Sequence, residues 1–125
     1  MRNLLFAVLL IAPISNASAQ QIDCAKRKMI AANTVLYCAD KDFEAADHEL
    51  NQIWRSVNTL TRTQKEYSKA ILHSQRAWLK FRDAQCNAET FSSEVFRKPN
   101  LQYILCKTRK TLSRTIELKW FVGDF

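Results

Sequence analysis

Apolar residues recur along this chain at alternating intervals of three and four positions. From Thr34 onward they are Leu36, Ala39, Phe43, Ala46, Leu50, Ile53, Val57 and Leu60. This spacing places them on one face and predicts a helix from about residue 35 to 60, with Thr34 as its N-cap. The acidic residues lie in the first half of this segment and Arg55 and Arg62 come late, the order that the helix macrodipole favours.

A second helical pattern begins after Thr63. The segment Thr63–Glu66 has the composition of a capping box, in which the threonine and glutamate side chains each accept a hydrogen bond from a backbone N–H. Apolar residues then continue at helical spacing: Tyr67, Ile71, Leu72, Trp78, Leu79, Phe81, Ala84, Cys86 and Ala88. Because only a few residues separate the two helices, we expect them to pack as an antiparallel hairpin, with Trp78 and Phe81 in the core.

The periodicity fails between Glu89 and Asn100, where paired serines and Pro99 predict a loop. Asn100 is placed to cap a third helix, and Gly123 is placed to end it. The apolar residues of this helix are Leu101, Ile104, Leu105, Leu112, Ile116 and Trp120. Residues 22–33 are compatible with a short helix or a turn. The predicted fold is therefore all-α, a small bundle made of a helical hairpin and a third main helix.

The composition agrees with this fold. The chain has 125 residues, of which 47% are hydrophobic and 25% are charged, with one glycine and two prolines. Strand-rich folds and nucleotide-binding loops need glycine at their tight turns, so the composition excludes β-sandwiches, P-loops and Rossmann units.

The N-terminus reads as a targeting segment. Arg2 precedes an apolar run from Leu4 to Pro13, and small residues follow up to Ala19, the pattern of a secretory signal peptide. The apolar run is about half the length that a membrane-spanning helix requires. We expect cleavage after Ala19, which makes residues 1–19 the signal peptide and residues 20–125 one exported domain, periplasmic or secreted. Loss of Arg2 lowers the formal net charge from +7 to +6.

Four cysteines lie in the exported part: Cys24, Cys38, Cys86 and Cys106. An even number in a small exported chain is typical of two disulfides. Chain geometry favours Cys24 with Cys38 and Cys86 with Cys106, each closing a loop worth about 3 kcal/mol, while crossed pairs from Cys24 remain open. The chain has no C-x-x-C pair and its histidines, His48 and His73, stand alone, so we expect neither a metal site nor a cofactor.

Two stretches carry a more specific pattern, CADKDFEAADHELNQIW at Cys38–Trp54 and QRAWLKFRDAQC at Gln75–Cys86. They resemble the N-terminal domain of LprI-type lysozyme inhibitors. In that family Asp-x-x-Leu-Asn-x-x-Tyr on one helix precedes Gln-Arg-x-Trp-x-x-(Tyr/Phe)-Arg-Asp-x-x-Cys on the next, and a later Cys precedes Thr-x-x-Arg. Here Cys106 and Thr111–Arg114 match the last element, while Trp54 replaces the usual tyrosine. The resemblance implies an exported, disulfide-bonded helical domain and, for at least some relatives, inhibition of lysozyme.

Seven polar residues define these patterns: Asp47, Asn51, Gln75, Arg76, Arg82, Asp83 and Arg114. They combine no nucleophile with a base and form no clear acid–base pair, so we expect no catalytic residue and no enzyme activity. We expect Arg82 and Arg114 to reach Asp47 as charge-assisted bridges that fix the helix register, with a role in binding as the alternative.

The positive net charge matters for binding to lysozyme. Animal lysozymes are themselves strongly basic, so long-range electrostatic steering would oppose association. Inhibition then needs local complementarity. One candidate surface is an acidic ridge of Asp40, Glu44 and Asp47. The other is the disulfide-tied loop, with the candidate contact residues Phe91, Ser92, Ser93, Glu94, Phe96 and Arg97; in the alternative interpretation its phenylalanines cover the end of the bundle.

The predicted third helix also carries a basic face, formed by Lys107, Arg109, Lys110, Arg114 and Lys119. This face suggests a second function, a structural or adaptor module of the cell envelope that binds anionic glycan or membrane surfaces. A solvated face near a helix C-terminus explains the same residues more simply, and export argues against nucleic acid as a partner. The leading hypothesis is a non-catalytic protein that binds lysozyme or a related peptidoglycan hydrolase stoichiometrically.

Overall fold

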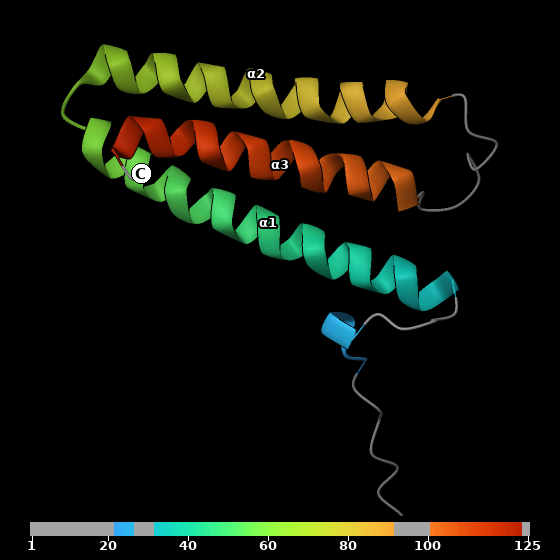
Figure 1. The fold of residues 1–125 in the computed structure, drawn as a ribbon. Coiled ribbons are helices and arrows are strands. Elements are labelled where there is room, and N and C mark those ends of the chain that lie inside the picture. The colour runs from blue at the N-terminus through green and yellow to red at the C-terminus, as the bar shows by residue number, and fades with distance from the viewer. Residues whose placement is uncertain (1–21, 27–31, 92–100, 124–125) are drawn as a thin grey trace, which may run out of the picture.

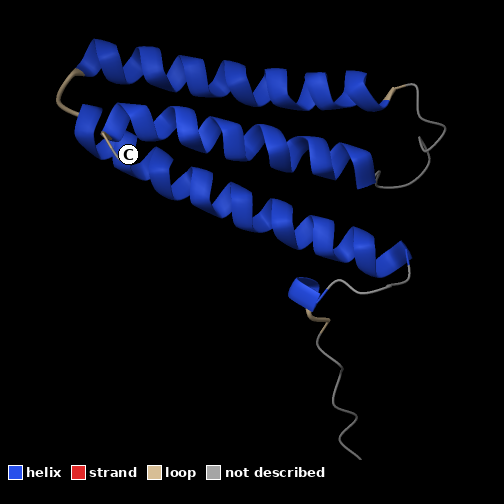
Figure 2. Cartoon of the chain, viewed as in Figure 1, coloured by secondary structure: helices blue, strands red, loops and turns tan. Residues whose placement is uncertain are grey.

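The computed structural model describes residues 22–26, 32–91 and 101–123. These residues form a short 3-10 helix, η1 (Cys24–Lys26), and three α-helices, α1 (Ala32–Thr61), α2 (Lys65–Thr90) and α3 (Leu101–Val122). Helices α1 and α3 run in the same direction and α2 runs opposite to both (Figure 1). The described residues contain no strand (Figure 2), so the predicted all-α fold with three main helices is confirmed.

Helix α3 holds the bundle together. It lies between the other two helices and packs mainly against α1 and less extensively against α2, whereas α1 and α2 contact each other least (Figure 1). The first two helices are antiparallel, as predicted, but they do not form a close-packed hairpin, because α3 separates them. Away from their connecting turn they diverge (Figure 1).

The apolar core is small and lies toward the turn between α1 and α2. Its buried residues are Leu50, Val57, Ile71 and Leu118, with Ile53, Trp54, Trp78 and Val122 packed against them. Phe81, predicted as a core residue, is 54% exposed, because it lies on the flank of α2 beyond the buried residues Gln75 and Arg82. Trp78 is half-buried.

Much of the remaining interior is polar and satisfies its hydrogen bonds locally. Thr61, Thr90 and Thr115 are buried, and each hydroxyl donates to a carbonyl oxygen four residues earlier, at 2.8–3.0 Å. A hydroxyl bonded to its own helix can be buried without an unsatisfied group. The bundle thus tolerates threonines where a larger domain would bury leucine or isoleucine.

Two predicted helix starts are wrong. Helix α1 begins at Ala32, so Thr34 lies inside its first turn and is not the N-cap. At α2 the residue before the helix is Gln64, whose side chain makes no capping hydrogen bond. The predicted capping box does not form, because the turn places Thr63 one residue too early, and Glu66 instead accepts a hydrogen bond from Lys69 at 2.9 Å.

The other helix ends agree more closely with the expectations. Helix α2 continues through Thr90, two residues into the predicted loop. Asn100, the predicted cap of α3, lies outside the described residues. Gly123 follows α3 with a φ of 68°, a left-handed conformation that favours glycine and ends the helix as predicted.

Two disulfides close the fold, Cys24–Cys38 and Cys86–Cys106, the two pairs that chain geometry favours. The first ties η1 to the beginning of α1, and the second joins the end of α2 to the beginning of α3. Cys86 and Cys106 are almost completely buried. Among the helices of the described segments, none has both the length and the apolar character needed to cross a membrane.

Candidate functional site

Arg82 is the centre of the polar interior and links all three helices. The residue is only 6% exposed. On its own helix Nε donates to Asp83 Oδ1 at 2.9 Å, and toward α3 Nη1 donates to Thr111 Oγ1 at 3.3 Å. Toward α1, Nη1 lies 3.9 Å from Asp47 Oδ1. The guanidinium therefore has a carboxylate partner on its own helix, a hydroxyl acceptor on α3 and a second carboxylate on α1. A buried charge requires such partners.

The Arg82 guanidinium also belongs to a stack in which cations and aromatic rings alternate. It lies 5.6 Å from the centroid of Phe43 and 5.3 Å from that of Trp78. At the outer ends, Lys107 Nζ lies 4.2 Å from the Phe43 centroid and the Arg114 guanidinium 5.8 Å from that of Trp78. We call these five residues the cation–aromatic stack. Because they come from all three helices, the stack connects α1 to α2 where the two helices diverge.

Arg114 does not make the predicted bridge to Asp47. Its Nε donates to Gln75 Oε1 at 3.0 Å, Nη2 to Ser74 Oγ at 3.3 Å and Nη1 to Glu117 Oε2 at 2.7 Å. The reason is the antiparallel register of α2 and α3, which places Thr111 opposite Arg82 and Arg114 opposite Gln75. The two arginines of the sequence patterns thus occupy successive levels of one interface.

Asp47 also lines an exposed hollow on α1. Asn51 Nδ2 donates to Asp47 Oδ2 at 3.0 Å, and the Asp47 side chain is 41% exposed. The hollow has a volume of about 460 Å³ and is lined by Phe43, Glu44, Asp47, His48, Asn51, Trp54 and Arg55. The Asp-x-x-Leu-Asn-x-x-Trp pattern therefore lies on an accessible flank, except for Leu50, which is in the core.

This flank carries the acidic ridge that the sequence predicts. Asp40 and Glu44 are exposed one turn apart and lead into the hollow at Asp47. Lys41 Nζ donates to Glu44 Oε2 at 2.6 Å, and this hydrogen bond raises the pKa of the lysine above its ordinary value. We call Asp40, Glu44, Asp47 and Asn51, with Trp54 at the end of the hollow, the acidic face of α1.

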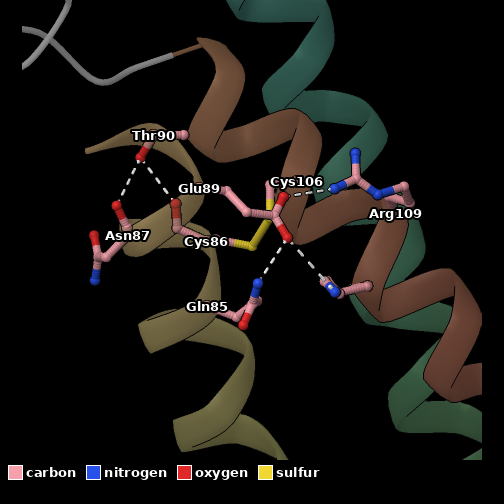
Figure 3. A network of polar contacts seen from close by, with 8 residues as sticks. Gln85, Cys86, Asn87, Glu89, Thr90, Cys106 and Arg109 are labelled. Atoms are coloured by element: carbon pink, nitrogen blue, oxygen red, sulfur yellow. Dashed lines mark hydrogen bonds and ion pairs between the residues drawn. A yellow bond between two sulfur atoms is a disulfide. The ribbon is translucent and has the colours of Figure 1, made fainter. Parts of the chain in front are cut away.

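A second polar network surrounds Glu89, beside the Cys86–Cys106 disulfide (Figure 3). Gln85 Nε2 donates to Glu89 Oε1 at 3.1 Å, and Arg109 Nη2 donates to Oε2 at 2.8 Å. Lys110 Nζ lies 3.7 Å from Oε1. The hydrogen bond from Gln85, together with the charges of Lys110 and Arg109, lowers the pKa of the Glu89 carboxyl.

Four of the five cations on the basic face of α3 pair with carboxylates of the same chain. Arg109 and Lys110 lie at Glu89, Arg114 pairs with Glu117, and Lys119 Nζ donates to Glu49 Oε1 at 2.9 Å. Arg109 and Lys110 share one carboxylate, and Lys107 Nζ lies over the Phe43 ring, so these pairs neutralise the basic face only in part.

The remaining predicted site residues do not belong to the cation–aromatic stack. Arg76, His48 and His73 are exposed. Phe91 is 76% exposed just after α2, and Ser92, Ser93, Glu94, Phe96 and Arg97 lie outside the described residues. The described segments hold no group of three or more His, Cys, Asp or Glu side chains placed to bind a metal ion.

The sequence patterns do not indicate that Phe43, Lys107 and Thr111 lie around Arg82. In the sequence, Phe43 belongs to the apolar stripe, Lys107 to the basic face and Thr111 to the last of the family patterns. Their contacts with Arg82 and with one another depend on the interhelical register. No spacing within one helix could have revealed them.

Comparisons with known proteins show the family to which this chain belongs. The family model for the lysozyme inhibitor LprI matches residues 24–118, which include Asp47, Arg82, all four cysteines and Arg114. The uncharacterized protein R02472 of Rhizobium meliloti (strain 1021) is 33% identical over 122 residues, covering 89% of this chain and 88% of that protein. No solved structure matches the chain. The chain belongs to the LprI lysozyme inhibitor family.

Proposed function

We propose that this chain is an exported, non-catalytic inhibitor of lysozyme or of a related peptidoglycan hydrolase, and that it acts by stoichiometric binding. The observation that carries the proposal is the family match over residues 24–118, which extends from η1 to the last turns of α3. Family membership implies a binding role, and the motif residues of this chain are engaged in pairing and packing rather than arranged as a nucleophile with a base.

Export is part of the proposal. Residues 1–19 have the signal-peptide pattern, and two disulfides are typical of proteins that function outside the reducing cytoplasm. In this proposal residues 20–125 form the mature protein, in the periplasm or outside the cell.

The acidic face of α1 is the proposed contact with a basic lysozyme. Helix α1 carries five acidic and two basic residues, whereas α3 carries one acidic and five basic residues. Charge is therefore segregated, and the acidic face offers local attraction although the whole chain is positive. The Glu44 side chain is 62% exposed, and the half-buried Trp54 supplies an aromatic anchor of the kind that dominates protein interfaces.

The loop after α2 is a second proposed contact. Phe91 is its one described candidate residue; the others are Ser92, Ser93, Glu94, Phe96 and Arg97. The Cys86–Cys106 disulfide joins the two helices that flank this loop, which limits the ordering cost if the loop enters the target's cleft.

The envelope-adaptor function has less support. It requires an unpaired basic surface on α3, but four of the five cations there already pair with Glu89, Glu117 or Glu49. We therefore retain the inhibitor as the proposed function.

A calorimetric titration of the oxidised full chain with a basic animal lysozyme tests the proposal and its contact face. The informative variant is Glu44→Lys, because Glu44 forms an exposed i, i+3 ion pair with Lys41 on the proposed face. Glu66→Lys is the matched control, since Glu66 forms the same kind of exposed pair with Lys69 on α2. We expect one-to-one binding that weakens with salt, a loss of about tenfold or more in affinity for Glu44→Lys, and wild-type affinity for Glu66→Lys.

The outcomes separate the function from its location on the molecule. Absence of binding by the wild-type chain would contradict the inhibitor function. Wild-type binding that both variants retain would contradict the acidic face as the contact and favour the loop. Equal losses in the two variants would mean that net charge, rather than a local contact, controls association.

A further inference from the structure

The two disulfides differ in how accessible their sulfur atoms are to a reductant. In the Cys86–Cys106 disulfide both residues are buried, at 0% and 3% exposed. In the Cys24–Cys38 disulfide Cys38 is 2% exposed, but Cys24 is only partly buried. Thiol–disulfide exchange requires that a thiolate reach one of the two sulfur atoms. Of the four cysteines, Cys24 is therefore the one that a thiolate reaches most readily in the folded chain.

The position of Cys24 in the fold also favours its reaction. Helix η1, which carries Cys24, lies beside the beginning of α1 and outside the three-helix bundle (Figure 1). The residues on either side of Cys24 are exposed, and none of the extensive packing between the described elements involves η1. A thiolate therefore reaches Cys24 without opening an interhelical interface. Access to the second disulfide requires α2 and α3 to move apart, which is a rarer opening of the fold.

The sequence around Cys24 is rich in positive charge. Residues 26–28 are Lys, Arg and Lys, against the one carboxylate of Asp23. Positive charge near a disulfide attracts an approaching thiolate and stabilises the cysteine thiolate that is released. Charge and access therefore both favour exchange at the first disulfide.

The Cys24–Cys38 disulfide anchors a part of α1 that lies away from the apolar core. The core begins at Leu50, about three turns after Cys38. Before Cys38, Val35 and Tyr37 are 42% and 43% exposed, so apolar burial does little to hold the first turns of the helix. Opening of this disulfide therefore leaves the beginning of α1 free to fray, whereas the core and the contacts between α2 and α3 remain.

We propose that the Cys24–Cys38 disulfide is a redox-sensitive switch, which a dithiol reductant opens while Cys86–Cys106 stays closed. The opened chain frays at the beginning of α1. The acidic face starts at Asp40, two residues after Cys38, so fraying removes the fixed position of its first carboxylate and weakens the contact with a basic lysozyme. This consequence for binding rests on the proposed inhibitor function, whereas the order of reduction and the fraying do not.

The exchange transfers two electrons and two protons from the dithiol to the cysteine pair. One thiolate of the dithiol attacks Cys24 Sγ, the S–S bond breaks, and the electron pair leaves on Cys38 Sγ, which takes up a proton. The second thiolate of the dithiol then attacks the reductant's own sulfur in the mixed disulfide and releases Cys24 as a thiolate, which is protonated in turn. The reductant ends as an intramolecular disulfide and both cysteines end as thiols.

Timed reduction of the oxidised full chain with dithiothreitol, followed by alkylation and peptide mass mapping, tests the order of reduction. We expect alkylation of Cys24 and Cys38 about tenfold or more faster than that of Cys86 and Cys106. Urea, which exposes all four cysteines, should reduce this ratio. Equal rates in the folded chain, or an unchanged ratio in urea, would overturn the proposal.

Amide hydrogen exchange of the double variant Cys24→Ala with Cys38→Ala tests the fraying. We expect the amides of residues 34–44 to exchange about tenfold or more faster than in the wild-type chain, and those of α2 and α3 to exchange at wild-type rates. The matched control is Cys86→Ala with Cys106→Ala, which should speed exchange in α2 and α3 instead. Wild-type exchange at residues 34–44 in the first variant would overturn the switch.

Calorimetric titration with a basic lysozyme distinguishes failure of the switch from failure of the inhibitor function. We expect the Cys24→Ala with Cys38→Ala variant to bind about fivefold or more weakly than the wild-type chain. Equal affinities would overturn the switch and leave the inhibitor function intact. If neither protein binds lysozyme, the inhibitor function fails, and the order of reduction and the fraying then decide whether the switch stands.

Discussion

Arg82 of α2 and Asp47 of α1 lie 3.9 Å apart, from Nη1 to Oδ1, across two helices that otherwise make few contacts. The two residues differ in accessibility, since the Arg82 side chain is 7% exposed and that of Asp47 is 41% exposed. The arginine is thus part of the interior, while the aspartate belongs both to the interior and to the acidic face. The pair therefore connects the polar interior to the proposed binding face, and a variant of Arg82 separates the structural role from the binding role.

Replacement of Arg82 by methionine tests the structural role. Arg82→Met removes two cation–aromatic contacts and the hydrogen bond to Thr111, while the carboxylates of Asp47 and Asp83 remain partly hydrated. We expect the free energy of unfolding in urea to fall by about 2–3 kcal/mol. Arg76→Met, at an exposed position of the same helix, is the control and should change stability little. A fully stable Arg82→Met protein that no longer binds lysozyme would show that Arg82 serves binding instead.

Phe43 tests the cation–aromatic stack. Phe43→Leu keeps an apolar side chain but removes the ring that lies between Lys107 and Arg82. We expect a loss of about 1–2 kcal/mol in unfolding free energy, more than the roughly 0.5 kcal/mol expected for Tyr37→Leu, where one exposed Lys41 contact is lost. Urea denaturation at neutral pH measures both losses. If the two variants lose the same amount, the stack contributes nothing beyond ordinary burial.

The two disulfides should make similar contributions to the free energy of unfolding. They close loops of 14 and 20 residues, and in the chain-entropy model each stabilises by about 3 kcal/mol. The double variant Cys86→Ala with Cys106→Ala should lose at least this amount, because both cysteines are buried between α2 and α3. The Cys24→Ala with Cys38→Ala variant should lose no more than this. Unfolding curves of both variants under oxidising conditions provide the comparison, and a reversed order would contradict the packing assigned to the second disulfide.

The lowered pKa of Glu89 predicts that the stability of the fold depends on pH. Its folded-state pKa lies below the ordinary 4.5, chiefly because Gln85 donates a hydrogen bond to the carboxylate. A lowered folded-state pKa means that the ionised carboxylate stabilises the fold above pH 4.5 and that this stability is lost as the pH falls through the folded-state value. We expect the urea midpoint of the wild-type chain to fall more steeply below about pH 5 than that of Glu89→Gln, with Gln85→Leu between them. Parallel curves for all three proteins would be inconsistent with this network.

Much of the fold could be predicted from periodicity, because each helix has an apolar stripe and the chain offers few residues that break helices. The disulfide pairs followed from the positions of Cys86 and Cys106 at either end of one chain reversal. The order of packing could not be predicted in this way. Nothing in the spacing of α1 or α2 indicates that α3 lies between them, or that the register of α2 and α3 places Arg114 opposite Gln75 instead of near Asp47.

The candidate site was predictable as a set of residues but not as a geometry. The paired patterns identified Asp47 and Arg82, yet the stack also requires Phe43 and Lys107, whose contacts depend on how the helices are aligned. The charge distribution could also be predicted only in part from the sequence. The basic face of α3 is evident in the sequence, whereas its neutralisation by Glu49 and Glu89 becomes evident only when the three helices are assembled.

The central claim, inhibition of lysozyme by stoichiometric binding, is tested most directly by a turbidity assay. Lysozyme at fixed concentration is titrated with the purified, oxidised full chain, and the clearing rate of a bacterial cell suspension is measured. We expect the rate to fall in proportion to added chain and to reach its minimum near one chain per enzyme, and we expect Glu44→Lys to shift the titration to higher concentrations. An unchanged clearing rate at a large molar excess of the chain would contradict the inhibitor function.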